Sequence, residues 1–349
     1  MIDVHVHFRD GVQQEKETIK HGFAVAHKAG IFSCFDMPNT APPLTTKEAI
    51  MNRLEMGQHS VETIDKNAIY RAYAGLTLEP GQIENMVALH RELFPRLVGF
   101  KMFAGHSTGN MGIIEKEQQQ VVYEKLAQCG YRGVIAVHCE KTSLMKEELF
   151  DLKRAETHSI ARPPIAEVES IKDQIELIER THFEGHLHIC HISTKEGIEL
   201  VKNAKAREMK ISCGATAHHA LLNTESYDKL GLLVKMNPPL RDEKDRQSVF
   251  EGLLLGNVDW IESDHAPHTL KDKEGGASGI PGFAGTLLLI KALRNAGIDE
   301  KSLTSLCGGN ANRVFNLDLP IAVPTNKEID ERLGYIRKAY PFDAFSYVE

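Results

Sequence analysis

The chain has 349 residues, of which 42% are hydrophobic and 26% are charged, and its formal net charge is -7. This composition is globular, and the acidic balance argues against a nucleic-acid-binding protein, which needs a basic face to neutralise phosphates. No apolar run approaches the roughly 20 residues that cross a membrane, so the composition excludes a membrane protein as well.

Short apolar runs alternate with longer amphipathic segments along most of the chain. We expect strands over residues 2–8, 31–37, 68–76, 97–103, 133–139, 186–192, 210–214 and 258–263. We expect helices between them, for example over 15–29, 46–59, 81–94, 115–129, 166–181 and 195–206. Eight strands alternating with helices predict an α/β protein with a parallel sheet closed into a (β/α)8 barrel. An open doubly wound sheet would carry a GxGxxG loop after its first strand, and the sequence there has none.

Two long segments, 221–241 and 266–283, interrupt the alternation, and in a barrel such loops lie at the catalytic rim. We predict one barrel domain over residues 1–319 and a polar, partly helical tail over 320–349 that packs on its outside. The six cysteines are scattered and form no CxxC pair, which indicates reduced, mostly buried thiols. The first residues lack the regions of a signal peptide, and we therefore expect a cytoplasmic protein.

The 17 histidines are the most unusual count in the composition. In the first strand, His5 and His7 share a face with Arg9, and Val4, Val6 and Phe8 take the other face, because side chains at i and i+2 of a strand point the same way. Two imidazoles on one face of an inner strand can chelate a metal ion. A pair of hydrogen-bonded core histidines has the same pattern, so the position of the other histidines decides between the two interpretations.

Further candidate ligands follow later strands, at the carboxyl-terminal rim where barrel enzymes act: His138, His191 and Asp264. Histidine with carboxylate favours zinc or a similar divalent ion, and four histidines with one aspartate exceed a single tetrahedral site. The sequence therefore predicts a two-metal centre. Cys139 and Cys190 each adjoin a candidate ligand, and we expect both to point toward the helices and to pack there.

Lys101 lies inside the apolar strand 97–103, where a bare ammonium group would be costly. One interpretation is a lysine that pairs with a carboxylate or extends to the rim. The other is a lysine that adds CO2 and bridges two metal ions as a carbamate. A carbamate would supply the negative charge that two neighbouring dications require.

From Asp3 to about Phe315, the chain resembles the dihydroorotases of the amidohydrolase superfamily. The resemblance rests on the strings DVHVHFRD, DMPNTAPP, GFKMF followed by HSTGNM, IAVHCEK, ICHISTKEGIELV, KMNPPLRDEKDR and ESDHAPH. It implies a (β/α)8 TIM barrel of the metal-dependent hydrolase type. It also implies two divalent metal ions, with Zn2+ as the expected metal.

By this resemblance, specific residues acquire roles in the metal centre. His5, His7 and Asp264 would bind the more buried ion. His138 and His191 would bind the second ion, and an N6-carboxylated lysine at position 101 would bridge the two.

The resemblance also implies substrate contacts. Arg9, Asn39 and His268 match positions that hold the substrate's carboxylate, and their chemistry suits an anion. Asn237 matches a position that contacts the ring in part of the family, or it is a turn residue before two prolines. Thr108 would close over the substrate in a mobile loop, or it belongs to an ordinary turn.

The implied reaction is the reversible hydrolysis of the cyclic amide of (S)-dihydroorotate to N-carbamoyl-L-aspartate, in de novo pyrimidine (UMP) biosynthesis. A metal-bridging hydroxide would attack the ring carbonyl, and Asp264 would take its proton and deliver it to the leaving nitrogen. The partner would be this small molecule. A homodimer and an association with other pyrimidine-pathway enzymes stay open.

The sequence departs from the family in several places, and alternatives remain. The chain begins too close to the HxH string for the amino-terminal half of an accessory β-sandwich, and its tail lacks alternating strands, so we expect a barrel without a complete accessory β-sandwich. A hydantoinase or allantoinase shares the barrel, the metals and the lysine, but a neutral ring would leave a carboxylate pocket unsatisfied. A non-catalytic relative acting as a scaffold would be expected to lose metal ligands.

Overall fold

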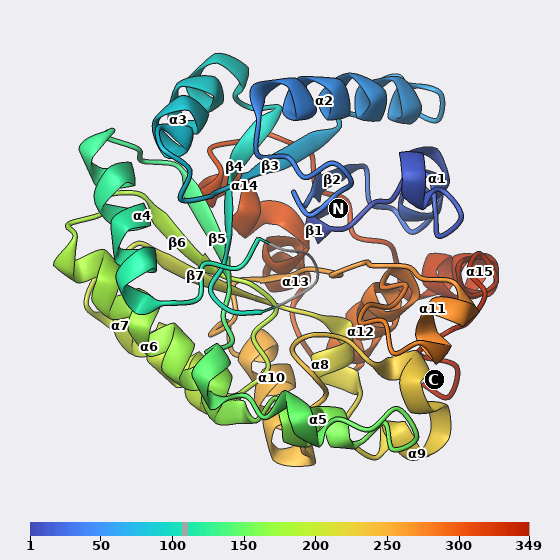
Figure 1. The fold of residues 1–349 in the computed structure, drawn as a ribbon. Helices are drawn as coiled ribbons and strands as arrows, with labels where there is room; N and C mark the ends of the chain where they lie inside the picture. Colours follow the sequence, from blue (N-terminus) through green and yellow to red (C-terminus); the bar gives the residue numbers. More distant parts are fainter. Residues whose placement is uncertain (107–110, 349) are drawn as a thin grey trace.

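The computed structural model describes residues 1–106 and 111–348, and within them eight parallel strands form one sheet in chain order. The strands are β1 (Ile2–Val6), β2 (Ser33–Asp36), β3 (Arg71–Gly75), β4 (Leu97–Phe103), β5 (Val134–His138), β6 (His186–Ile189), β7 (Ile211–Ala215) and β8 (Trp260–Ile261). Each overlaps the strand that the sequence predicts. The strands gather at the centre of the molecule with helices around them, and the predicted (β/α)8 barrel is confirmed (Figure 1).

The barrel closes between its shortest strand, β8, and β1. Among the described residues, β8 pairs with β7, whereas its contact with β1 is carried by the segment just after β8. There the His7 N–H donates to the His265 carbonyl at 2.7 Å, and the Ser263 N–H donates to Asp3 Oδ1 at 3.1 Å. The seam of the barrel therefore lies beside the HxH string.

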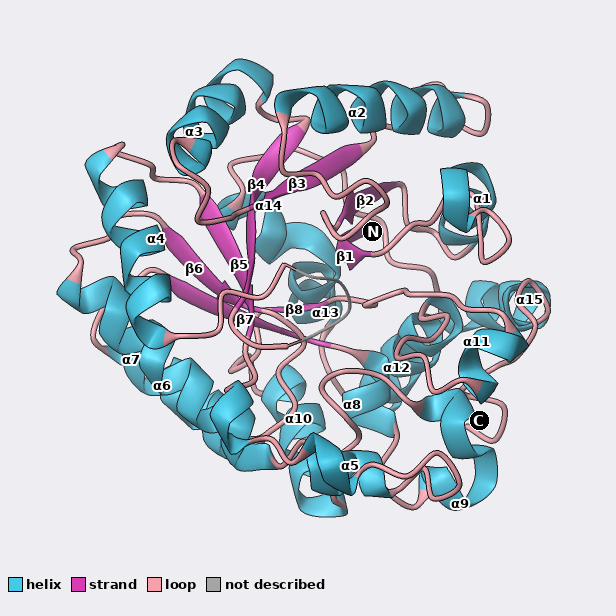
Figure 2. Cartoon of the chain, viewed as in Figure 1, coloured by secondary structure: helices cyan, strands magenta, loops and turns pink. Residues whose placement is uncertain are grey.

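The helices form an outer layer around the strands (Figure 2). The longer ones are α1 (Ile19–Lys28), α2 (Lys47–Glu62), α3 (Gln82–Leu93), α4 (Lys116–Gln128), α6 (Pro164–Arg180), α7 (Lys195–Ala206), α10 (Glu243–Leu254), α12 (Phe283–Asn295) and α15 (Asn326–Arg337). Short helices are α5 (Thr157–Ala161), α8 (Ala217–Leu221), α9 (Ser226–Leu230), α11 (Leu270–Glu274), α13 (Glu300–Thr304) and α14 (Asn310–Val314). Single 3-10 or π turns cover Gly11–Gln13, Thr142–Leu144, Glu147–Leu149, Gly231–Val234 and Ser305–Gly309. No described helix is long and apolar enough to cross a membrane.

Local capping explains where the helices depart from the predicted bounds. The side chain of Thr18 accepts the His21 N–H at 3.1 Å, so α1 begins at Ile19 and not at residue 15. Helix α6 begins two residues earlier than predicted, at Pro164. Proline suits that position because it lacks an N–H, which would have no partner in the first turn, and its φ is already helical.

Strand β1 does not alternate strictly. Its pairing register with β2 shifts between Asp3 and Val6. As a result Val4 packs in the apolar cluster inside the barrel, whereas Val6 and Phe8 pack with the helices. The prediction that Val4 shares their face is wrong, because a bulge adds one residue to the strand.

The interior cluster fills the barrel below the rim. It includes Val4, Tyr73, Trp260 and, from the segment after α14, Phe315. Cys190 also belongs to this cluster, so the prediction that it points toward the helices is wrong. Cys139 packs in the outer cluster, as predicted.

The carboxyl-terminal segment packs against the outside of the barrel. Helix α15 contacts α12 and α1, and Phe345 fills the space beside Gly285, where a Cβ would lie 2.2 Å from its ring. Tyr340 donates a hydrogen bond to Glu17 Oε1 at 2.6 Å. A domain boundary at residue 319 stays a prediction.

Candidate metal centre and substrate pocket

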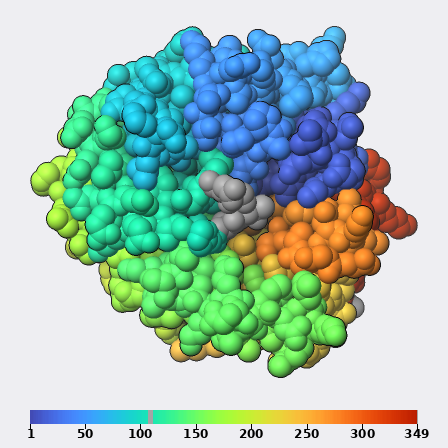
Figure 3. Space-filling view, viewed as in Figure 1, coloured from blue at the N-terminus to red at the C-terminus, as the bar shows by residue number. Residues whose placement is uncertain are grey.

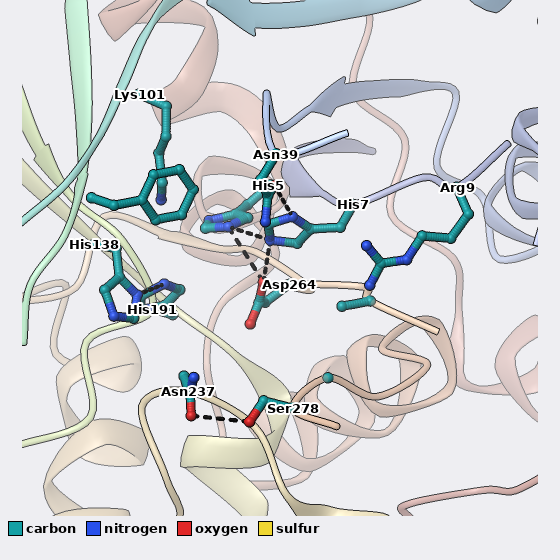
Figure 4. Close-up of a pocket in the computed structure, with 13 residues that line it drawn as sticks. His5, His7, Arg9, Asn39, Lys101, His138, His191, Asn237, Asp264 and Ser278 are labelled. Carbon is teal, nitrogen blue, oxygen red and sulfur yellow. Dashed lines mark hydrogen bonds and ion pairs between the residues drawn. The ribbon is translucent and has the colours of Figure 1, made fainter. Parts of the chain in front are cut away.

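Three side chains from the two sides of the barrel seam converge on one point. His5 Nε2 lies 3.2 Å from His7 Nε2, and Asp264 Oδ1 lies 3.3 Å and 2.9 Å from these two nitrogens. All three side chains are buried, and Figure 4 shows them directed at one another. This is the arrangement that three ligands of one cation adopt.

A second pair of imidazoles faces the same pocket from β5 and the end of β6. His138 Nδ1 lies 3.1 Å from His191 Nε2. Asp264 and His191 both have a positive φ, of 46° and 37°. Such backbone is costly for residues other than glycine and is concentrated at functional sites.

Lys101 extends from β4 into this pocket above the histidine pair (Figure 4). Its Nζ lies 3.1 Å from Cys190 Sγ and 5.1 Å from the centre of the Phe103 ring. Within residues 1–106 and 111–348, no carboxylate lies within ion-pair distance of Nζ. The interpretation of Lys101 as the partner of a carboxylate is therefore wrong.

In three of these histidines, the outer ring nitrogen, which points away from the converging ligand atoms, faces an oxygen atom. His7 Nδ1 lies 2.7 Å from Asn39 Oδ1, His5 Nδ1 lies 3.2 Å from Glu262 Oε1, and His138 Nε2 lies 3.0 Å from Glu140 Oε2.

An oxygen that accepts the outer N–H fixes the tautomer and leaves the inner nitrogen as a free donor toward a cation. The sequence interpretation missed Glu262 and Glu140. Each lies two residues from a predicted ligand, Asp264 or His138, and the i, i+2 rule for strands could have found both.

Burial lowers the pKa values of His7, His138 and His191 below the ordinary histidine value. Neutral imidazole is the form that binds a cation. Burial opposes ionisation of Asp264, but its interactions with His7 and His5 outweigh that effect. They hold the pKa of Asp264 below its ordinary value. His7, His138 and His191 are thus neutral nitrogen donors beside an ionised carboxylate, whereas for His5 the effect of burial is outweighed by Cys190 and Glu262, which raise its pKa to about 10.

Arg9 forms the opposite wall of the pocket (Figure 4). Its side chain is only 4% exposed, and among the described residues no carboxylate lies within ion-pair distance of the guanidinium group. Burial lowers its pKa. His268 lies beside it, with Nε2 at 3.5 Å from Arg9 Nη2 and 3.0 Å from the Ser278 carbonyl oxygen. A buried cation of this kind is suited to an anionic ligand.

The remaining wall comes from the two long rim segments. Asn237 Oδ1 accepts a hydrogen bond from Ser278 Oγ at 3.2 Å and lies 3.0 Å from His158 Nε2. Lys235 Nζ donates to Ser278 Oγ at 2.6 Å. These bonds tie segments 221–241 and 266–283 together. On the molecular surface, the second of them (orange) lies beside the segment after β1 (dark blue), where Lys16 pairs with Asp272 at 3.6 Å (Figure 3).

One pocket of about 410 Å³, counted to its open mouth, therefore unites most of the predicted site residues. Those that line it are His5, His7, Arg9, Asn39, Lys101, His138, His191, Asn237 and Asp264. His268 stands behind Arg9, and Thr108 lies outside the described residues.

Solved structures with the same fold include hydantoinases. The chain superimposes on an L-hydantoinase (dihydropyrimidinase) from Arthrobacter aurescens with a TM-score of 0.77 and 22% identity, over 90% of this chain and 70% of that one. A D-hydantoinase from Bacillus sp. AR9 gives a TM-score of 0.76 and 19% identity, over 93% and 74%. The chain therefore has the barrel fold of these two enzymes.

Sequence comparison narrows the fold to a family. The chain is 36% identical over 322 residues to a dihydroorotase from Pyrococcus abyssi (91% of this chain, 68% of the relative). It is 34% identical to one from Pyrococcus horikoshii (91% and 66%) and 32% identical to one from Methanosarcina mazei (91% and 70%). The chain belongs to the dihydroorotase family, and it spans about two thirds of the length of these relatives. No protein-family model matches the sequence.

Proposed function

We propose that the chain catalyses the reversible hydrolysis of the cyclic amide of (S)-dihydroorotate to N-carbamoyl-L-aspartate, a step of de novo pyrimidine biosynthesis. The observation that carries this proposal is the buried Arg9 guanidinium, with no carboxylate partner among the described residues, in the same pocket as two groups of converging imidazoles. A small cyclic amide that bears a carboxylate matches both features. The relatives named dihydroorotase support the same assignment.

The donor atoms fit two divalent cations. Neutral imidazole nitrogens and an ionised carboxylate are ligands that Zn2+ prefers, and Zn2+ is the metal we expect. Lys101 would join the two ligand groups after its amine adds CO2, because a carbamate is an anion and an ammonium group would repel the cations. When bound, two such cations lower the pKa of a water molecule and polarise the amide carbonyl.

Asp264 is the group that we propose moves the proton. Its lowered pKa keeps it ionised at neutral pH, so it can accept a proton from the attacking water. Its Oδ1 lies 2.9 Å from His7 Nε2, so the carboxylate is directed into the pocket. As the ring opens, the same carboxylate delivers the proton to the departing amide nitrogen, and it removes that proton again when the ring closes.

The other residues hold the substrate. Arg9 would bind its carboxylate through two parallel N–H groups, with Asn39 and His268 beside it. Asn237 would contact the ring from the opposite wall. Thr108 would close over the bound ring and exclude water.

An assay with dihydroorotate, hydantoin and allantoin, combined with metal analysis, tests the proposal. We expect turnover of dihydroorotate by the metal-loaded protein. Turnover of hydantoin or allantoin without dihydroorotate would identify another cyclic amidohydrolase. A folded, metal-loaded protein without turnover of any of the three would indicate a non-catalytic relative.

A further inference from the structure

Phe8 connects the two parts of the proposed site, because His7 before it is a metal ligand there and Arg9 after it is the carboxylate ligand. The peptide groups on both sides of Phe8 are held from outside β1. The Phe8 N–H donates to Asp36 Oδ1 at 2.9 Å, and the Phe8 carbonyl accepts a hydrogen bond from Arg53 Nη2 at 2.8 Å. One pair of side chains, from β2 and α2, therefore fixes the backbone between the two ligands.

These two side chains form a buried ion pair that a tyrosine completes. Arg53 Nε and Nη2 lie 3.0 Å and 2.7 Å from Asp36 Oδ2, so the guanidinium group binds this oxygen through two donors. Burial raises the pKa of Tyr70, and its protonated hydroxyl donates to the same oxygen and accepts from Arg53 Nε at 3.0 Å. All three side chains are buried. We refer to Asp36, Arg53 and Tyr70 as the Asp36 cluster.

A glycine on α2 makes room for the tyrosine. Gly57 lies one helical turn after Arg53, and a Cβ on Gly57 would lie 2.3 Å from Cδ1 of the Tyr70 ring. The Tyr70 N–H donates to Gln58 Oε1 at 3.0 Å, which ties the backbone before β3 to the same helix. A side chain at position 57 would displace the ring and, with it, the hydroxyl group that reaches Asp36.

The Asp36 cluster also determines which cation Asp36 neutralises. Burial lowers the pKa of Arg9, and the nearby carboxylates of Glu17 and Asp36 oppose that effect. Both oxygens of Asp36 are occupied, Oδ2 by Arg53 and Tyr70 and Oδ1 by a backbone N–H. Arg53 therefore neutralises Asp36, and the Arg9 guanidinium group is left for an anion from outside the protein.

We propose that Asp36, Arg53 and Tyr70 are positioning residues that fix Arg9 relative to His7, and that they thereby select a ring that carries a carboxylate. The hydrogen bonds to the two peptide groups set the spacing between the carboxylate ligand and the metal ligand. The ion pair between Arg53 and Asp36 keeps a neighbouring anion from competing with the substrate for Arg9. The identity of the selected ring rests on the proposed function, whereas the hydrogen bonds that hold the backbone do not.

Steady-state kinetics with dihydroorotate on the metal-loaded protein test the selection. Arg53→Met leaves Asp36 as an uncompensated anion near Arg9, so KM should rise roughly tenfold, with a smaller change in kcat. Arg53→Lys restores the charge and should recover most of the wild-type KM. Arg71→Met is the matched control and should keep the wild-type KM, because Arg71 is also buried but donates to Ser33 Oγ, at 2.7 Å.

Tyr70→Phe is a milder second variant, because it keeps the ion pair and removes only the hydroxyl group. It should raise KM by a smaller factor. An unchanged KM in both Arg53→Met and Tyr70→Phe, or a fall in kcat at constant KM, would overturn the proposal.

Amide hydrogen exchange at Phe8, measured without substrate, reports on the hydrogen bond to Asp36 whatever the substrate is. Exchange should be faster in Arg53→Met and Tyr70→Phe than in the wild type, and unchanged in Arg71→Met. Unchanged exchange at Phe8 in the first two variants would refute the positioning role. A wild type that does not turn over dihydroorotate refutes the proposed function, and faster exchange in the variants would then still support the positioning role.

Discussion

Replacing Arg9 with methionine tests the substrate assignment most directly. The change removes a buried positive charge while it keeps most of the volume of the side chain, which is 4% exposed. Because no described carboxylate pairs with the guanidinium group, the substitution strands no anion of the protein itself. The loss should therefore appear in substrate binding and turnover and not in folding.

The expected magnitude follows from the pocket. Removing one partner of a buried charge pair costs about 3–5 kcal/mol, since the remaining charge stays uncompensated. A factor of ten corresponds to about 1.4 kcal/mol. We expect kcat/KM for dihydroorotate to fall by roughly one hundredfold to a few thousandfold. The change for hydantoin, which has no carboxylate, should be much smaller.

The assay compares kcat/KM for the two substrates in the wild type, Arg9→Met and Arg132→Met. Arg132 is the control because its side chain is 73% exposed in an ion pair with Glu184. A loss of less than about tenfold for dihydroorotate, or an equal loss for both substrates, would refute the role of Arg9 as the carboxylate ligand.

Four other variants or conditions test separate parts of the site. Lys101→Ala should lose metal and activity, with partial rescue by short carboxylic acids; two metals per chain without rescue would argue against a carbamate. Glu140→Gln should weaken the second cation roughly 10- to 100-fold in a chelator competition, whereas Glu147→Gln, on an exposed carboxylate, should not. Burial lowers the pKa of His158 from 6.5 to about 3, so between about pH 3 and pH 6.5 the unfolded chain binds one more proton at this residue than the folded chain. As the pH is lowered through this range, this group should reduce the free energy of unfolding of the metal-free protein by about 1.4 kcal/mol per pH unit. In urea titrations above and below pH 6.5, the unfolding free energy of His158→Gln should depend less steeply on pH, and an unchanged dependence would contradict the burial argument. Thr108→Ala should lower kcat, and full turnover would remove the closing role.

The strands and the residues at their ends could be predicted because both depend on local patterns. Strand β4 was predicted at both bounds, since its apolar run is sharply delimited. His138 and Asp264 follow apolar runs, and in a barrel the ends of all strands meet at one rim.

What could not be predicted depends on backbone geometry that no local pattern specifies. Strict alternation placed Cys190 opposite His191, but β6 ends at Ile189, and the positive φ of His191 turns the chain there. Both side chains consequently face the barrel interior. Val4 was misplaced for a similar reason, the bulge in β1. The partner of Lys101 was unpredictable for the same cause, since it depends on where Cys190 points.

The position of His5, His7 and Asp264 at the seam between β8 and β1 also affects the stability of the barrel. β8 has two residues, and few hydrogen bonds join its end to β1. His5 and His7 lie on one side of this seam and Asp264 lies on the other. A cation bound by all three would therefore link the two sides and stabilise the closed barrel. Metal loading would then slow amide hydrogen exchange at His7 and Ser263 more than in the strands opposite. In the proposed mechanism, an ion that activates water would therefore also hold the barrel closed.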